Sequence, residues 1–98
     1  MSALSDAIDH DLRLAILQLL AGEVGFQANV RVLHTAVVGL RFRVSRDKVV
    51  TEVAWLREQR LVEVDALPQD VSVVKATVRG REVAQGLVAV PGVSQPEA

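Results

Sequence analysis

The stretch from Val44 to Val64, VSRDKVVTEVAWLREQRLVEV, most constrains how this chain folds. Ser45 is a residue type that caps helix N-termini, and Asp47 follows in the first turn, where an acid interacts favourably with the helix dipole. Apolar residues then recur at helical spacing, at Val49, Val53 and Leu56. The stretch runs directly into a valine-rich segment at Leu61. We therefore predict a helix over residues 45–60 that leads straight into a strand.

The other periodicities and turn signals predict three further helices and two strands. A broad apolar stripe indicates a helix from about Ile8 to Ala21. Asn29 is placed to cap a second helix, which Gly39 breaks. Residues 39–44 then form the turn that precedes the helix at 45–60. Two strands and a last helix are expected over 61–67, 71–77 and 77–87, with Pro68-Gln69-Asp70 as the turn between the strands.

These elements fit one α+β domain, mainly helical with a small β-hairpin, in the order α-α-α-β-β-α. A length of 98 residues is that of a single domain. We place this domain at residues 1–87. Residues 88–98 contain Pro91, Gly92 and Pro96, and we expect them to form an extended or disordered C-terminal tail.

The composition is unusually aliphatic for so short a chain. Half of the residues are apolar but only 3% are aromatic, and a domain of this size cannot bury that much aliphatic surface alone. We therefore expect a homodimer, with Leu17 and Leu87 on the flanks of the first and last helices among the contacts. No apolar run approaches the roughly 20 residues of a membrane span. The acids near the N-terminus are also unlike a secretory signal, so we expect no membrane association.

Positive charge is concentrated in the middle of the chain. Residues 1–30 carry four acids and one arginine, for a net charge of −3, and residues 61–98 carry five acids and three bases, for −2. Residues 31–60 carry seven bases and three acids, for +4. This segregation of positive charge onto the middle segment favours contact with a polyanion. The competing interpretation is that solvated helices carry charges in any case.

Motifs for metal binding and catalysis are weak or missing. Asp9, His10 and Asp11 are adjacent, but neighbouring helix residues point in different directions, and His34 is at no ligand spacing from them. The absence of cysteine excludes a thiolate zinc site and a cysteine nucleophile. No glycine-rich phosphate loop, no GxSxG motif and no paired carboxylates on a plausible cleft occur. We therefore expect no metal, no cofactor and no enzymatic activity.

Two local patterns resemble winged helix-turn-helix proteins of the ArsR-, MarR- and PadR-like superfamily. Residues 53–62, VAWLREQRLV, resemble the LxxLxxxGLV ending of their recognition helix. Residues 76–84, ATVRGREVA, resemble the LTxxGxxxA entry into their final helix. The chain departs from the superfamily at Arg60, which replaces a glycine that is usually left-handed, at a cost of roughly 1 kcal/mol. The expected wing tip, residues 67–70, also has no arginine to enter a minor groove.

Nearly the whole chain also resembles a small group of winged-helix proteins from Mu-like transposable bacteriophages and prophages. This resemblance rests on the segments LRLAILQLL, VSRDKVVTEVAWLREQ and VPGV, at residues 12–20, 44–59 and 90–93. It implies a DNA-binding protein that acts as a phage or prophage transcriptional regulator in the cytoplasm of the bacterial host cell. Its partner would be double-stranded DNA, with the helix at 45–60 in the major groove.

On a helical wheel, one face of this helix is suited to meet DNA. Arg46 is placed to read a guanine edge, and Val50 to touch a thymine methyl group. Thr51 and Arg57 are expected to contact the backbone of the DNA. Arg41 and Arg43, in the turn, are expected to contact phosphates. The full predicted set of DNA contacts is Arg41, Arg43, Ser45, Arg46, Asp47, Val50, Thr51 and Arg57.

An alternative function uses the same scaffold without DNA. A winged-helix module can bind a host or phage protein instead, and the acid-rich ends and the uncharged wing tip of this chain favour that interpretation. The +4 middle segment favours DNA. Trp55 lies off the DNA-facing side, so we expect it in the core or in a subunit interface rather than as a platform for base stacking.

Overall fold

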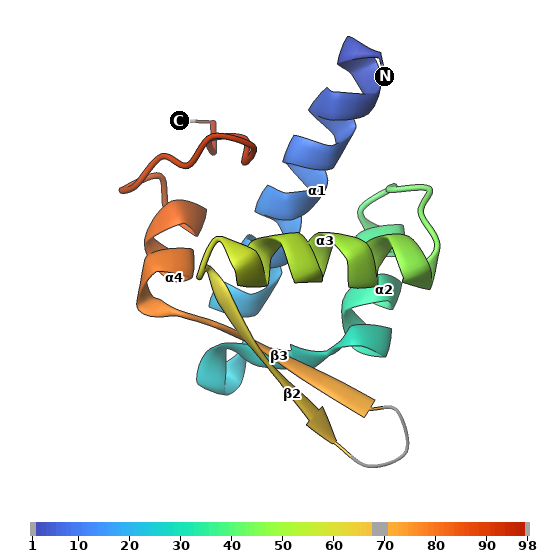
Figure 1. Ribbon diagram of the computed structural model, residues 1–98, viewed down its shortest axis with the longest axis vertical. Helices are drawn as coiled ribbons and strands as arrows, with labels where there is room; N and C mark the ends of the chain where they lie inside the picture. Colours follow the sequence, from blue (N-terminus) through green and yellow to red (C-terminus); the bar gives the residue numbers. More distant parts are fainter. Residues whose placement is uncertain (1, 68–70, 98) are drawn as a thin grey trace.

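Helix α1 (Ala3–Ala21) is the first element of the computed structural model, which describes residues 2–67 and 71–97 (Figure 1). It begins five residues before the predicted Ile8, because the Ser2 side chain accepts a hydrogen bond from the Ser5 amide at 3.0 Å and caps the first turn. The C-terminal half of α1 lies in the core, whereas its N-terminal half projects beyond the other helices (Figure 1). The apolar periodicity therefore located the buried half and missed the exposed one.

A short strand outside the predicted elements follows α1. The turn η1 (Val24–Phe26) reverses the chain through two left-handed residues, Gly25 with φ 71° and Phe26 with φ 58°. Strand β1 (Gln27–Asn29) then pairs antiparallel with β3 (Val71–Ala76). The predicted order α-α-α-β-β-α therefore needs correction, because a strand precedes α2 and the sheet formed by the described residues has three strands rather than two.

The next two helices begin at the predicted capping residues. The Asn29 side chain accepts a hydrogen bond at 2.8 Å from an amide in the first turn of α2 (Val30–Gly39). The Ser45 hydroxyl does the same at 3.0 Å for α3 (Arg46–Glu58). Both predicted caps are confirmed, since each satisfies an amide that has no partner within its helix. The turn between the two helices spans residues 40–45, one residue later at each end than the predicted 39–44.

Strands β2 (Val62–Leu67) and β3 form the predicted hairpin, in a sheet with the order β1-β3-β2. In its register Val62 lies opposite Ala76 and Val64 opposite Val74. Side chains at Val62, Val74 and Ala76 are buried on the face of the sheet that meets the helices. The predicted turn Pro68-Gln69-Asp70, with its missing arginine, lies outside the described residues.

Helix α4 (Val78–Ala84) packs closely against the start of the hairpin. The Thr77 hydroxyl accepts a hydrogen bond from the Gly80 amide at 3.0 Å and caps the helix. A Cβ atom on Gly80 would overlap the carbonyl oxygen of Leu61 and would lie 3.4 Å from the side chain of Leu17. Leu17 is completely buried. The expectation that Leu17 contacts a second subunit is therefore wrong, because α4 covers that side of α1.

The segment after α4 has no helix or strand as far as residue 97, but it packs on the domain. Helix α4 ends three residues before the predicted Leu87. Val90 and Val93 are only 6% and 7% exposed and contact the core. The segment that we expected to be an extended or disordered tail is thus irregular in backbone and fixed in place.

Within residues 2–67 and 71–97, four α-helices and a three-stranded antiparallel sheet share one aliphatic core, so the predicted α+β class is confirmed. Helix α3 lies across α1 and beside the hairpin, with one long side facing away from the body (Figure 1). Among the described residues, no helix is long and apolar enough to cross a membrane.

Candidate nucleic-acid interface

All eight residues predicted to contact DNA have exposed positions on two adjoining segments. Arg41, Arg43 and Ser45 belong to the turn, and the other five belong to α3. Within α3, burial divides the helix into an inner side and an outer side. The inner side consists of Val49, Glu52, Val53 and Leu56. The outer side contains Arg46, Asp47, Val50, Thr51, Ala54, Arg57 and Glu58, all of them exposed.

The turn before α3 is held by bonds from α2. The Phe42 amide donates to the carbonyl oxygen of Val37 at 3.1 Å, and His34 Nε2 donates to the carbonyl oxygen of Val44 at 2.8 Å. Arg41 has φ 78°, in the left-handed region where a non-glycine residue is strained. These constraints place Arg41 and Arg43 on either side of a half-buried Phe42. The His34 side chain thus caps this turn.

An open hollow of about 510 Å³ lies between the outer side of α3 and the hairpin. Its lining is mostly aliphatic and includes Val50, which is 47% exposed. Arg57 and Glu58 border the hollow from the last turn of α3. The residues that line it are Val30, Val50, Val53, Ala54, Arg57, Glu58, Val64 and Ser72. A partner bound here would therefore meet apolar surface as well as charge.

The charges on this surface are mixed. Among the described residues, none of the four predicted arginines (Arg41, Arg43, Arg46 and Arg57) forms an ion pair with another described residue. Asp47 and Glu58 interrupt the arginines at the two ends of α3. Three of the four arginines, Arg41, Arg43 and Arg46, follow one another closely in sequence in the turn and at the start of α3.

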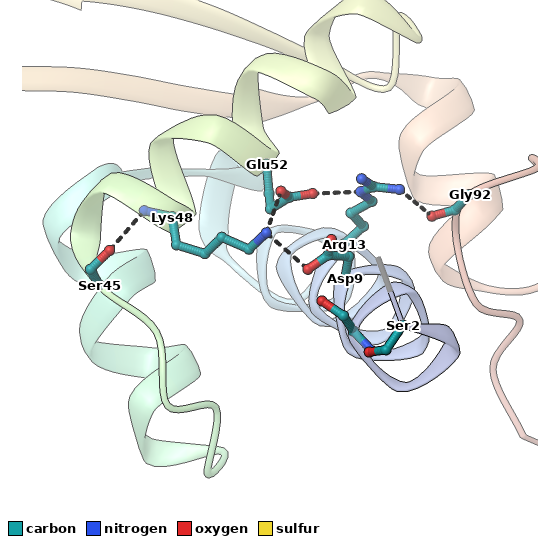
Figure 2. A network of polar contacts seen from close by, with 8 residues as sticks. Ser2, Asp9, Arg13, Ser45, Lys48, Glu52 and Gly92 are labelled. Atoms are coloured by element: carbon teal, nitrogen blue, oxygen red, sulfur yellow. Dashed lines mark hydrogen bonds and ion pairs between the residues drawn. The ribbon is translucent and has the colours of Figure 1, made fainter.

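A buried ion-pair network holds the inner side of α3 (Figure 2). Glu52 is only 3% exposed, and its two oxygens contact Arg13 Nε at 2.6 Å and Lys48 Nζ at 3.1 Å. Lys48 Nζ also lies 2.8 Å from Asp9 Oδ1, and the hydrogen bond to Asp9 raises the pKa of Lys48 above its ordinary value. One of the seven bases in the positive segment is thus directed at α1 and not at the candidate interface.

The sequence interpretation did not find this network. Lys48 and Glu52 have the i, i+4 spacing of a helical ion pair, so their contact within α3 could have been predicted from the sequence. Arg13, the lone base in an acidic segment, is a weaker signal for the other half of the network. The predicted position of Trp55 is confirmed in that its ring packs half-buried against the core, and the Arg13 guanidinium carbon lies 4.0 Å from the ring centroid.

The side chains of the adjacent residues Asp9 and Asp11 contact different partners. Asp9 pairs with Lys48, the carbonyl oxygen of His10 accepts from the Ser94 amide, and Asp11 accepts from the Ser94 hydroxyl. Across residues 2–67 and 71–97, no group of three or more histidine, cysteine, aspartate or glutamate residues could hold a metal ion.

Comparison with known proteins links the chain to bacteriophages. It is 38% identical over 93 residues to the uncharacterized protein gp26 of Escherichia phage Mu, covering 95% of each chain. It is 32% identical over 74 residues to an uncharacterized protein of Haemophilus influenzae Rd, covering 76% of this chain and 72% of that protein. No protein-family model and no solved structure matches it. The chain belongs to the protein family that includes gp26 of phage Mu.

Proposed function

We propose that this protein is a winged helix-turn-helix protein that binds double-stranded DNA and regulates phage or prophage transcription in the cytoplasm of the bacterial host. The order of elements from α2 to α4 supports the proposal, since two helices joined by a turn precede a hairpin and a last helix. The phage Mu relative is consistent with such an origin. The observation that carries the proposal is the outer side of α3, where an exposed valine lies among arginines that form no ion pair with any other described residue.

Each part of this surface has a role in the proposed complex. Arg46, the first residue of α3, would donate to a guanine edge in the major groove, and Val50, one turn later, would contact a thymine methyl group. Arg57 and Thr51 would contact the DNA backbone. Arg41 and Arg43, fixed by the turn, would neutralise phosphates and set the register of the helix.

A salt titration of DNA binding tests the proposal. A mobility shift with random duplex DNA at low salt comes first, followed by selection of a preferred site from a random pool. Arg46→Ala should lose roughly 1–3 kcal/mol of DNA-binding free energy and should relax the sequence preference at one base position. Arg43→Ala should weaken binding to all DNA sequences equally. It should also reduce, by about one, the slope of the logarithm of the binding constant against the logarithm of the salt concentration.

The control variant is Lys75→Ala, which removes an exposed cation from β3 opposite Glu63, outside the candidate interface. It should bind like the parent protein. If Arg46→Ala and Arg43→Ala both keep the parent affinity, the outer side of α3 does not face DNA.

The hollow beside α3 favours a second function, that of a protein-interaction module for a host or phage protein. Its aliphatic lining and the carboxylate of Glu58 at its border suit an amphipathic protein segment better than a uniform polyanion. A folded protein that fails to shift duplex DNA at low salt would favour this function. Val50→Lys separates the two, because an added cation should strengthen contact with DNA and weaken an apolar protein contact.

We also propose that the protein is a homodimer. Leu4, Ile8 and Leu87 are 72%, 43% and 70% exposed, which leaves aliphatic side chains on the projecting half of α1 and after α4 for a second subunit. Sedimentation should give twice the mass of the 10.6 kDa chain at tens of micromolar. A monomer at that concentration would contradict an obligate dimer.

A further inference from the structure

The segment from residue 88 to residue 97, which we call the strap, lies against the side of α3 that faces away from the candidate interface. Gly92 has φ 95°, and a Cβ atom built on it would lie 2.6 Å from Cζ2 of Trp55. Only a residue without a side chain can approach the Trp55 ring so closely in this backbone conformation. Val90 and Val93, on either side of Gly92, are buried. The strap therefore makes direct contact with α3.

Arg13 of α1 connects the strap to α3 with a single side chain (Figure 2). Its Nε donates to Glu52 Oε1 at 2.6 Å, and its Nη1 donates to the carbonyl oxygen of Gly92 at 2.9 Å. The same guanidinium stacks on Trp55. Two residues of α3 and one of the strap thus share one rigid, planar donor group.

A second attachment fixes the strap to α1. The Ser94 amide donates to the carbonyl oxygen of His10 at 3.2 Å, and its hydroxyl donates to the Asp11 carboxylate. The strap has no helix or strand of its own. Its position depends on these few contacts and on its two buried valines.

We propose that the strap is a positioning element for α3 and that Arg13 is the positioning residue that links them. A helix end with few tertiary contacts opens locally at low free energy, and the docked strap ties down the C-terminal half of α3. A ligand on the outer side of α3 then meets a helix that is already ordered, so docking of the strap and binding of the ligand favour one another. The effect on α3 stands alone, whereas its consequence for DNA rests on the proposed function.

The fluorescence of Trp55 reports directly on the strap, because it is the one tryptophan of the chain. Gly92→Ala places a methyl group against the ring and should dislodge the strap. We expect emission at longer wavelength and stronger quenching by acrylamide than in the parent protein. The matched control is Gly22→Ala, whose new Cβ would make only ordinary contacts, the nearest at 3.6 Å. Unchanged fluorescence in Gly92→Ala would show that the strap is not docked on Trp55 in solution.

Hydrogen exchange distinguishes positioning of α3 from a general loss of stability. In Gly92→Ala, the amides of residues 55–58 should exchange on the order of tenfold faster, the scale of a typical coupling free energy. Amides in the middle of α2, near Leu33 and Val37, should keep their parent rates. Equal acceleration in both helices would overturn the proposal, since the strap would then be only another part of the core.

Two milder variants keep the test valid if Gly92→Ala does not fold. Arg13→Lys keeps a cation beside Glu52 but cannot also bond Gly92, and Ser94→Ala removes the bond to Asp11 at a partly exposed position. Both should accelerate exchange in α3 in the same direction as Gly92→Ala, by a smaller factor. Parent exchange rates in both variants would overturn the role of these contacts.

The same variants test whether docking of the strap is coupled to DNA binding. Random duplex DNA should reduce the quenching of Trp55 in the parent protein, and Gly92→Ala should bind DNA roughly fivefold or more weakly than Gly22→Ala. A parent protein that does not bind DNA would contradict the proposed function, while the exchange rates in α3 would still decide the role of the strap. Binding by Gly92→Ala at the control affinity would overturn the coupling to DNA.

Discussion

Arg13 and Glu52 join α1 to α3 through a 2.6 Å bond between residues 39 positions apart in the chain. The carboxylate is almost completely buried, and the Arg13 side chain is 13% exposed. A buried charge is tolerated only when it is paired and hydrogen-bonded. Lys48 supplies the second partner of Glu52 from the preceding turn of α3. The inner side of the candidate recognition helix is therefore fixed by electrostatics as well as by aliphatic packing.

Replacement of Glu52 should reveal the strength of this network. Glu52→Gln keeps the shape of the side chain but leaves the cations of Arg13 and Lys48 without their shared counter-charge. Removal of one partner of a buried pair costs about 3–5 kcal/mol, and we expect a loss near the lower figure, since Lys48 keeps Asp9. Urea denaturation measures the change. Glu58→Gln, on the outer side of α3, should change stability by less than about 0.5 kcal/mol, and a similarly small change at Glu52 would contradict the network.

The same network predicts a loss of stability at alkaline pH. The hydrogen bond to Asp9, with further contributions from Glu52, raises the pKa of Lys48 above the ordinary 10.5. A raised pKa in the folded state means that Lys48 contributes stability that is complete below pH 10.5 and is lost as the pH rises through the folded value. Urea midpoints between pH 8 and pH 12 measure this contribution.

Lys48→Met should lower stability at neutral pH and remove this part of the alkaline decline. Lys75→Met, which leaves the network intact, should retain the decline of the parent protein. An alkaline profile that is identical in the parent protein and in Lys48→Met would show that Lys48 does not pair in solution.

Local signals in the sequence were sufficient for the starts of α2, α3 and α4, but they missed the start of α1 and were insufficient for the long-range contacts. Asn29, Ser45 and Thr77 each cap a helix through an amide three residues later, so neighbouring residues determine the outcome. β1 is only three residues long and forms because β3 lies beside it, which no pattern within residues 27–29 encodes. The pairing of Arg13 with Glu52 likewise depends on how α1 crosses α3.

For the candidate site, too, local sequence patterns predicted some features and missed others. The exposure of the five predicted residues in α3 followed from helical periodicity, because the buried positions of α3 repeat every three or four residues. The net charge at the candidate interface could not be obtained by counting charged residues in the sequence, because the Lys48 side chain turns toward α1. The packing of residues 88–97 was also missed, because Pro91 and Gly92 indicate irregular backbone and say nothing about where it lies.

Arg60 carries a strain that a single substitution should relieve. Its φ is 62°, the left-handed conformation that the resemblance to winged-helix regulators predicted for a glycine at this position. Arg60→Gly should stabilise the protein by as much as about 1 kcal/mol, reduced by the greater flexibility of glycine in the unfolded chain. Arg60→Ala loses the same charge and keeps the strain, so it should show no gain. If Arg60→Gly and Arg60→Ala are equally stable, the backbone at residue 60 is not strained.

Val50 and Val53 offer a test of the inner and outer sides of α3 within one turn of the helix. Val53 is 4% exposed and Val50 is 47% exposed. Val53→Asp places an unpaired carboxylate in an aliphatic core at a cost of several kcal/mol, which is comparable to the whole stability of a small domain. It should therefore unfold the protein, as judged by circular dichroism. Val50→Asp should melt cooperatively near the parent temperature, because the new carboxylate stays in water.

If the proposed function holds, folded Val50→Asp should lose measurable DNA binding, since its charge would face the phosphates across the major groove. A cooperative melt of Val53→Asp at the parent temperature would show that α3 turns a different side to the core. Parent-like DNA binding by Val50→Asp would place the nucleic acid elsewhere on the protein, and the valine-lined hollow would then be better explained as a site for a protein partner.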